Sequence, residues 1–280
     1  MTEIQGYDAG LTAEAGLTAD EAVGSKGAPA EASQGKPLGQ PGNAEADIAE
    51  LVEVLKKRSD TYALLSRLYR QEIDQELLDE MHGMLYPAED IDEHIYNGNL
   101  FIATYLSNLW SGSLDDLRVD FARCFLGHGV DGFSAAYPYE SVYTSEKRLM
   151  MQVARDEVLA VYRAYGITKT NEWKEGEDHL SLELEFMRIL NERAIQAFLD
   201  GELEKAEGLL TAQLGFQESH LLPWVPMLVA DMKRFAQTKM YLGLADLTLG
   251  FLRTDSQFLA DLFSDQQEPD ALDAGTKVEG

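Results

Sequence analysis

The apolar residues of this chain recur at the spacing of an α-helix from Asp47 to about residue 264, and this pattern limits the fold more than any other feature. Its first stripe consists of Ile48, Leu51, Val52, Leu55, Tyr62, Leu65, Leu68 and Tyr69. Residues three or four positions apart share one face of a helix. No window alternates apolar and polar residues between turn signals, so strands are not expected. We predict an all-α fold, a single domain of about eight to ten helices with long loops.

Start and stop signals divide the later part of the chain into helices. A stripe from Met150 to Tyr165 is closed by Gly166. The stretch 175–187 opens a long helix that runs to about Leu199, before Asp200 and Gly201. Ser113 and Asp116 form a capping-box-like start. The remaining helices are expected over about 202–214, 216–236, 239–252 and 255–264. The stretch "GHGVDGFSAAYPYE" has glycines, a proline and no period, so it is expected to be a long loop of the kind that often carries function.

The two ends of the chain differ from the helical domain, which is predicted over 47–264. Residues 1–46 are rich in Gly, Ala and Glu, with Tyr7 as the single aromatic residue, and are expected to form a disordered tail. Residues 265–280 are polar and are expected to be loose. The tail lacks the basic and apolar regions of a targeting signal, and no stretch reaches the roughly 20 apolar residues of a membrane span. A cytoplasmic protein without stable membrane insertion is therefore expected.

Charge and cysteine content exclude several classes of function. The formal net charge of -26 argues against nucleic acid or an anionic membrane as a partner, because phosphate binding depends on clustered Lys and Arg. Cys124 is the single cysteine, so neither an internal disulfide nor a cysteine-based zinc cluster can form. Any metal site would need histidines and carboxylates.

The stretch "EGEDHLSLELEFM", residues 175–187, joins acidic residues and a histidine to an apolar run. His179 and Glu183 would share a helical face, but no further ligand motif completes a metal site. Nucleophile elbows and phosphate-binding glycine loops are also absent. The acidic residues can instead serve the start of a helix, where the macrodipole favours negative charge and Asp178 can cap free N–H groups. We expect no catalytic residues, no metal and no cofactor.

Three segments together resemble the TorD/DmsD-like family of chaperones that mature molybdenum redox enzymes. The acidic stretch resembles the family signature E-P-E-D-H with its following helix. "DFARCFLGHG" at 120–129 resembles an aromatic helix end with glycine, and "YPYESVYTSEKRLMM" at 137–151 resembles a Pro-aromatic-Glu-Ser-Val-Tyr segment. The order and spacing also agree, over at least residues 113–190. Gly176 stands where the family has proline, and Cys124 stands where it has leucine.

The resemblance implies a non-enzymatic binder that holds the twin-arginine signal peptide or the apoenzyme of a molybdopterin oxidoreductase until its cofactor is loaded. Its implied binding region is made of Glu177, Asp178 and His179, with a neighbouring groove shaped by Phe121, Phe125, Pro138, Tyr139, Glu140 and Tyr143. A twin-arginine leader carries two guanidinium groups beside an apolar stretch, so its receptor needs carboxylates next to an apolar groove. Glu140, Glu175, Glu177 and Asp178 are candidates for carboxylates at a partly exposed rim.

Two other interpretations remain open at the level of sequence. One is a metal- or nucleotide-dependent helical enzyme or switch that uses the cluster of Asp178 and His179, although the sequence offers no complete site. The other is a purely structural helical adaptor. The chain is expected to be a monomer or a domain-swapped homodimer.

Overall fold

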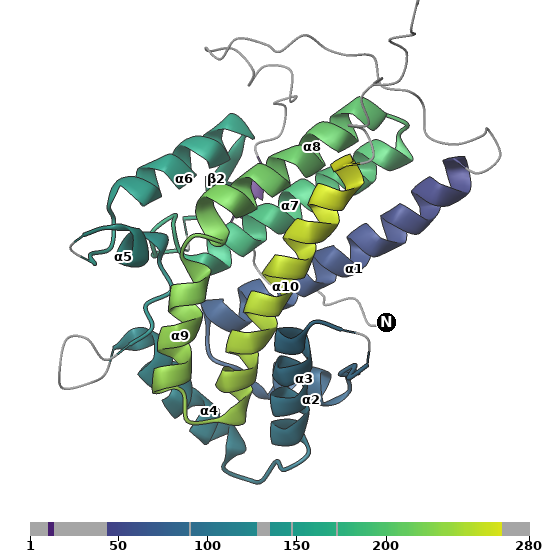
Figure 1. The fold of residues 1–280 in the computed structure, drawn as a ribbon. Helices are drawn as coiled ribbons and strands as arrows, with labels where there is room; N and C mark the ends of the chain where they lie inside the picture. Colours follow the sequence, from purple (N-terminus) through teal and green to yellow (C-terminus); the bar gives the residue numbers. More distant parts are fainter. Residues whose placement is uncertain are drawn as a thin grey trace, which may run out of the picture.

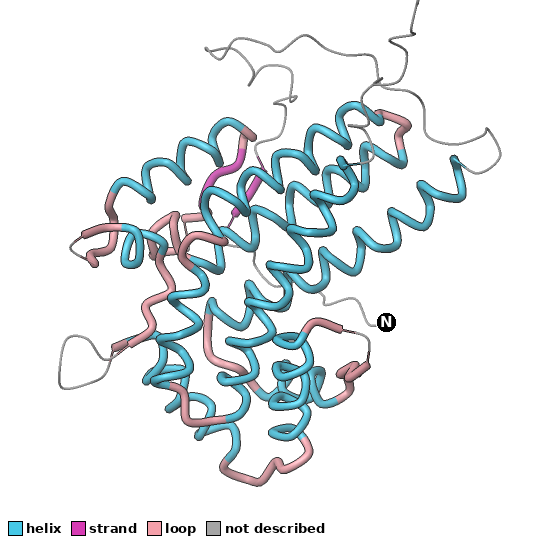
Figure 2. The backbone as a smooth tube through the Cα atoms, in the orientation of Figure 1, coloured by secondary structure: helices cyan, strands magenta, loops and turns pink. Residues whose placement is uncertain are grey.

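A computed structural model describes residues 11–13, 44–89, 91–127, 135–146, 148–171 and 173–264, and over these ranges the chain is mostly helical (Figures 1 and 2). The prediction of a single all-α domain is confirmed. None of the helices in these ranges is long and apolar enough to cross a membrane.

Ten α-helices lie within the described residues, at the upper end of the predicted number. They are α1 Ala44–Arg70, α2 Gln75–His82, α3 Glu93–Leu106, α4 Ser113–Phe121, α5 Glu140–Thr144, α6 Val153–Ala164, α7 Leu180–Leu199, α8 Leu203–Phe216, α9 Val225–Phe235 and α10 Lys239–Ser264. Two π-helical turns continue α4 and α8, namely η2 Ala122–Leu126 and η3 Gln217–Leu221.

The predicted C-terminal ends of the helices agree with the structure better than the predicted N-terminal starts. Gly166 and Gly201 have φ of 61° and 77° just beyond α6 and α7, in the left-handed region that glycine enters without strain. The capping box at Ser113 is wrong: the hydroxyl of Ser113 accepts a hydrogen bond from the Trp110 N–H, 2.9 Å away, and Gly112 precedes the helix without a side-chain cap. The stripe that began at Met150 is also too long, because α6 begins at Val153.

Helix α10 is continuous where the sequence predicts two helices. The predicted boundary lies between residues 252 and 255. Asp255 is in fact buried and bound by polar partners from other helices, so its polarity marks an internal contact and not a helix end.

Two short strands form a sheet that the sequence did not predict. Strand β1, Leu11–Ala13, pairs antiparallel with β2, Ile167–Lys169. Three residues are too few to show alternation, and β1 lies within the segment 1–46 that is predicted to be a tail. Helix α1 begins slightly earlier than the predicted start at Asp47. The other residues of the predicted tail up to residue 43, and residues 265–280, lie outside the described part of the chain.

A buried ion pair joins the long helices. The Nε of Arg58 on α1 lies 2.5 Å from Oδ1 of Asp255 on α10, and both side chains are almost fully buried. Asn191 of α7 accepts from Arg58 Nη1 at 2.5 Å, and Gln213 of α8 accepts from Nη2 at 3.1 Å. Tyr62 donates its hydroxyl hydrogen to Asp255 at 2.6 Å. Four helices are thus connected through one guanidinium and one carboxylate.

Helices α3 and α10 lie side by side (Figure 1). A glycine of each helix, Gly98 and Gly243, lies in their contact. A Cβ added to Gly98 would lie 2.7 Å from the backbone N of Leu247 and 2.9 Å from the carbonyl oxygen of Gly243. A Cβ on Gly243 would in turn lie 2.8 Å from the carbonyl oxygen of Gly98. The obstacles are backbone atoms, which cannot rotate away.

We therefore expect Gly98→Ala to lower the free energy of unfolding by about 1–3 kcal/mol, because the helices must separate to admit the methyl group. The matched control is Gly208→Ala on α8, where nothing lies within 4 Å of the added Cβ. The control should stabilise the protein by roughly 0.5–1 kcal/mol through helix propensity. Urea unfolding of both variants measures the difference, and equal effects would contradict the close approach.

Candidate functional site

The segments that carry the family-like motifs meet at a short backbone junction. The carbonyl oxygen of Pro138 accepts from the N–H of Leu180 at 2.8 Å, and the carbonyl oxygen of Asp178 accepts from the N–H of Glu140 at 3.0 Å. Tyr139 and His179 face each other in an isolated antiparallel bridge. Residues about 40 positions apart in sequence therefore form one structural unit, which we call the 138–141/178–180 junction.

Asp178 fastens this junction and does not cap the helix as predicted. Its side chain is fully buried, and Oδ2 accepts from both the N–H of Ser141, at 3.0 Å, and the Ser141 hydroxyl. The cap of α7 is His179, whose Nδ1 accepts from the N–H of Ser181 at 3.1 Å. The histidine thus makes the helix cap that was predicted for Asp178, and the acidic residue binds Ser141 instead.

His179 lies between aromatic rings in the interior. The ring centroids of Tyr139 and Trp173 lie 4.9 and 5.4 Å from its own, both in edge-on orientation. Burial lowers the pKa of His179 to about 3. The imidazole is therefore neutral near pH 7, and it serves the helix start as a hydrogen-bond acceptor.

The predicted carboxylate rim is wrong for three of its four members. Glu140, Glu177 and Asp178 are buried, and only Glu175 is exposed. Glu175 accepts a hydrogen bond from the hydroxyl of Tyr139.

Glu177 is already neutralised by two basic side chains. The Nε of Arg155 lies 2.6 Å from one of its oxygens, and the ammonium of Lys169 lies 3.4 Å from the other. Burial would raise the pKa of Glu177, but the Arg155 hydrogen bond and the charge of Lys169 lower it below its ordinary value. Glu177 thus ties the junction to α6 and β2.

Buried acids also face one another beneath the junction. Oε2 of Glu140 lies 3.1 Å from Nδ1 of His220 on η3. Glu183, one turn into α7, has no exposed surface. Burial, together with the nearby carboxylates of Glu140 and Asp178, raises the pKa of Glu183 well above its ordinary value. Burial also raises the pKa of Glu140, against the opposing effect of His220.

The predicted groove aromatics divide between the core and the surface. Phe121 and Phe125 are buried, with ring centroids 5.1 Å apart, and Phe125 also contacts Tyr69 and Tyr241 edge-on. They support the site from within and do not line its surface. Tyr143 is only partly buried, and its ring stacks on Trp224 with centroids 5.7 Å apart.

Sequence reasoning missed an exposed apolar loop beside the junction. Leu149, Met150, Met151 and Val153 are each about half exposed or more. Met151 has φ of 57°, an uncommon value for a residue with a side chain. The signal was present as three large apolar residues in succession before α6, but it was read as the beginning of the helical stripe.

This apolar loop, residues 149–153, is fixed to the junction by a direct contact. The N–H of Gln152 donates to the hydroxyl oxygen of Ser141 at 3.1 Å, and that hydroxyl donates to Asp178. Arg148, just before the loop, lies over the ring of Tyr143 and forms an ion pair with Asp231 of α9. Met227, one turn earlier on α9, is also exposed. Buried Asp178 therefore helps to hold an apolar surface that it does not itself reach.

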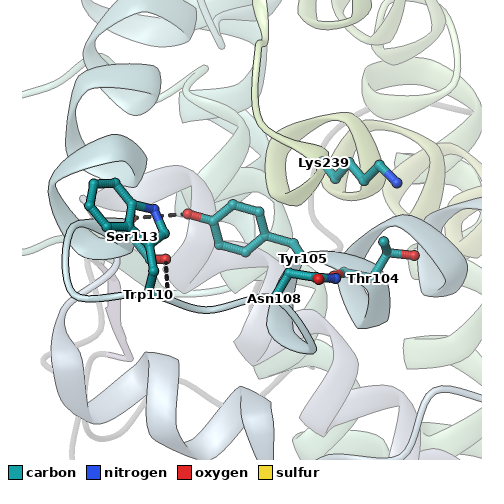
Figure 3. A pocket seen from close by; sticks show the side chains of 6 residues that line it. All are labelled: Thr104, Tyr105, Asn108, Trp110, Ser113 and Lys239. Carbon is teal, nitrogen blue, oxygen red and sulfur yellow. Dashed lines mark hydrogen bonds between the residues drawn. The ribbon is translucent and has the colours of Figure 1, made fainter.

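A separate pocket of about 400 Å³ lies between the end of α3 and the beginnings of α4 and α10 (Figure 3). The lining residues are Thr104, Tyr105, Asn108, Trp110, Ser113 and Lys239. None of them belongs to the predicted site. Within the described ranges, no group of three or more His, Cys, Asp or Glu residues is placed to hold a metal ion.

Comparison with known proteins shows which family and which relatives this chain is similar to. The profile of the family described as "Nitrate reductase delta subunit" matches residues 89–230, just over half of the chain. "Chaperone protein TorD" of Photobacterium profundum is 29% identical over 218 residues, which cover 75% of this chain and 97% of that protein. A second TorD chaperone, from Vibrio cholerae serotype O1, is 28% identical over 222 residues, covering 77% and 98%.

A solved structure from Archaeoglobus fulgidus, assigned to redox enzyme maturation, is 18% identical and covers 72% of this chain and 93% of its own. Its TM-score of 0.37 is too low to support an argument about the fold.

For Asp178→Ala, we expect the free energy of unfolding to fall by about 1–3 kcal/mol, because the N–H and hydroxyl of Ser141 lose their acceptor in a buried place. Asp156→Ala is the control, since Asp156 is exposed on α6 and should change stability by less than about 0.5 kcal/mol. Chemical denaturation measures both. A loss no larger than that of the control would show that the junction does not depend on Asp178.

Glu183 should make stability depend on pH. Its folded-state pKa is raised, so its stabilising contribution is complete below the unfolded pKa, near 4.5, and is lost as pH rises toward the folded value. Glu183→Gln cannot ionise, so its Tm relative to the natural protein should increase from pH 5 to pH 8. Glu157→Gln, on the exposed side of α6, is the matched control without such an increase. A constant Tm difference for Glu183→Gln would rule out the buried ionisation.

Proposed function

Because the chain belongs to the nitrate reductase delta subunit family, we propose that it is a chaperone in the maturation of a redox enzyme and is not itself an enzyme. The relatives named as TorD chaperones support this, since the match covers almost their whole length and three quarters of this chain. The site supports it as well, because its polar groups are engaged in holding backbone segments together.

In finer detail, the proposed client is the twin-arginine leader, the apoenzyme, or both, of a molybdopterin-dependent oxidoreductase, bound in the cytoplasm before export. This detail rests on the resemblance of the three motifs. A leader of this kind combines two guanidinium groups with an apolar stretch. Its receptor must therefore offer apolar surface and carboxylates together.

The observation that carries the proposal is the exposed apolar loop 149–153, attached to the 138–141/178–180 junction. Single exposed apolar residues are common, but four of them within five positions mark an interaction surface. Methionine side chains are flexible and polarisable, and they suit surfaces that accept variable apolar partners. We assign the apolar stretch of the client to this loop, with Tyr143 beside it.

Carboxylates near the loop can receive the guanidinium groups. Asp156 in the first turn of α6, Glu157 after it, Glu146 before the loop, and Glu175 shortly before the junction are all exposed. Exposed pairs of this kind contribute more to specificity and association rate than to affinity, so the apolar loop should dominate binding.

The predicted site residues then act mainly from inside. In the proposed arrangement Asp178, His179 and Glu140 hold the junction, Glu177 ties it to α6, and Phe121 and Phe125 support it from the core. Pro138 and Tyr139 supply the paired backbone. Variants at these positions should displace the apolar loop and thereby weaken client binding. The loss of client binding should increase with the loss of protein stability.

The test is affinity purification from the native cell, with bound proteins identified by mass spectrometry. The variant is Leu149→Asp/Met151→Asp, which places two charges in the apolar loop. Aspartate tolerates positive φ better than most residues, so the backbone at position 151 should be retained. We expect the natural protein to capture a molybdopterin oxidoreductase subunit and the variant to lose at least tenfold of it, with unchanged Tm.

The matched control is Leu85→Asp, because Leu85 is 92% exposed and lies between α2 and α3, away from the junction. It should capture the client as well as the natural protein does. Equal capture by the loop variant would reject the loop as the contact surface. If the oxidoreductase is present in the extract and the natural protein does not capture it, the chaperone function itself is rejected.

A further inference from the structure

Strand β1 belongs to a segment that occurs twice in the chain. Residues 9–13 read Ala-Gly-Leu-Thr-Ala, and residues 15–19 read the same five amino acids. An acidic residue follows each copy, Glu14 in the first and Asp20 in the second. The first copy contains β1, so the second copy has the same sequence as a segment whose binding place the structure describes.

The binding place of β1 has two parts. The first is the edge of β2, with Leu11 opposite Lys169, Thr12 opposite Thr168 and Ala13 opposite Ile167. The second is an apolar contact, because Leu11 is only 2% exposed and belongs to the same buried cluster as Ile167.

Beside Leu11 lies a pocket of about 390 Å³ on α7, lined in addition by Arg188, Ile189, Glu192, Arg193 and Gln196. We call the β2 edge and this surface of α7 the strand-docking groove. Its two arginines are held in place, Arg188 by ion pairs with Glu185 and Glu192 and Arg193 by a hydrogen bond to the carbonyl oxygen of Tyr165.

The spacing of the copies allows either one to fit the same groove. They are six residues apart, and side chains in a strand alternate with a period of two, so a shift of six returns every side chain to the same face. Leu17 would replace Leu11, and Thr18 would replace Thr12. Residues 20–43 would then connect the docked copy to α1, and 24 residues can span about 80 Å when extended.

We propose that the strand-docking groove is a binding site for the N-terminal segment of this chain, with residues 11–13 and 17–19 as interchangeable occupants. A three-residue strand binds weakly by itself, but attachment to the same chain keeps both copies at a high effective concentration. The exchange keeps the β2 edge covered, which prevents its pairing with other chains. This proposal does not depend on the proposed function.

The first test is hydrogen exchange in the full-length chain, read from the β2 amides. Leu11→Asp and Leu17→Asp should each leave protection of residues 167–169 within about twofold of the natural protein, because the other copy remains. The double variant Leu11→Asp/Leu17→Asp should lose at least tenfold.

Each departure from this pattern overturns part of the proposal. If Leu11→Asp alone loses as much protection as the double variant, the second copy is not an occupant. If the double variant keeps its protection, the groove is not a docking site. Far-UV circular dichroism on every variant separates these outcomes from general unfolding.

Disulfide trapping tests the exchange without disturbing the leucines. The pairs Thr12→Cys/Thr168→Cys and Thr18→Cys/Thr168→Cys should both give intrachain disulfides after mild oxidation. Ser25→Cys/Thr168→Cys is the control for random collision, since Ser25 lies outside both copies, and its yield should be several-fold lower. The buried Cys124 does not compete. A yield for Thr18→Cys equal to the control, or disulfides between two chains, would contradict the intrachain exchange.

Discussion

The buried ion pair between Arg58 and Asp255 is the constraint on which the helical arrangement depends. A guanidinium and a carboxylate with little exposure are tolerated only when their remaining hydrogen-bonding positions are filled. Asn191, Gln213 and Tyr62 fill them from three directions. Apolar side chains alone would allow helices to slide by a turn at little cost, but this network is satisfied in one arrangement. The polar contacts therefore select the register, while the surrounding apolar core supplies most of the stability.

The same register reaches the candidate site through α1 and α7. Arg58 binds Asn191 near the middle of α7, and two turns further along α1 the hydroxyl of Ser66 donates to the carbonyl oxygen of Ser181 at 2.8 Å. Two such contacts, eight residues apart on one helix and ten apart on the other, fix the axial position of α7. The N–H of Ser181 also binds His179, so the capped start of α7 and the junction before it are held against α1.

Several residues around that junction depart from the usual preferences for burial and backbone conformation. Glu183 carries a carboxyl group in the interior, and Arg148 and Met151 adopt positive φ although they carry side chains. Such features lower stability and persist only where the surrounding contacts enforce them. They lie on both sides of the Ser141–Asp178 contact: Glu183 is buried beneath it, Met151 lies in the apolar loop and Arg148 lies just before that loop. The interior of the junction is thus closed by hydrogen-bonded polar groups, whereas the adjacent loop leaves its apolar side chains exposed.

The sequence by itself determined the all-α fold, the ends of α6 and α7 at their glycines, and the family, because helical spacing, glycine conformation and linked motifs are local properties. The family resemblance also pointed to Pro138, Tyr139, Glu140, Asp178 and His179, which the structure brings together in the junction. Only the tertiary structure decided which of them are accessible, because burial depends on partners distant in sequence: Asp178 is enclosed by Ser141, and Glu177 is paired with Arg155 and Lys169. For the same reason, the sequence did not predict that α10 is one continuous helix. Asp255 stands at the start of the second helix predicted there, and its role becomes visible only beside Arg58, 197 residues away.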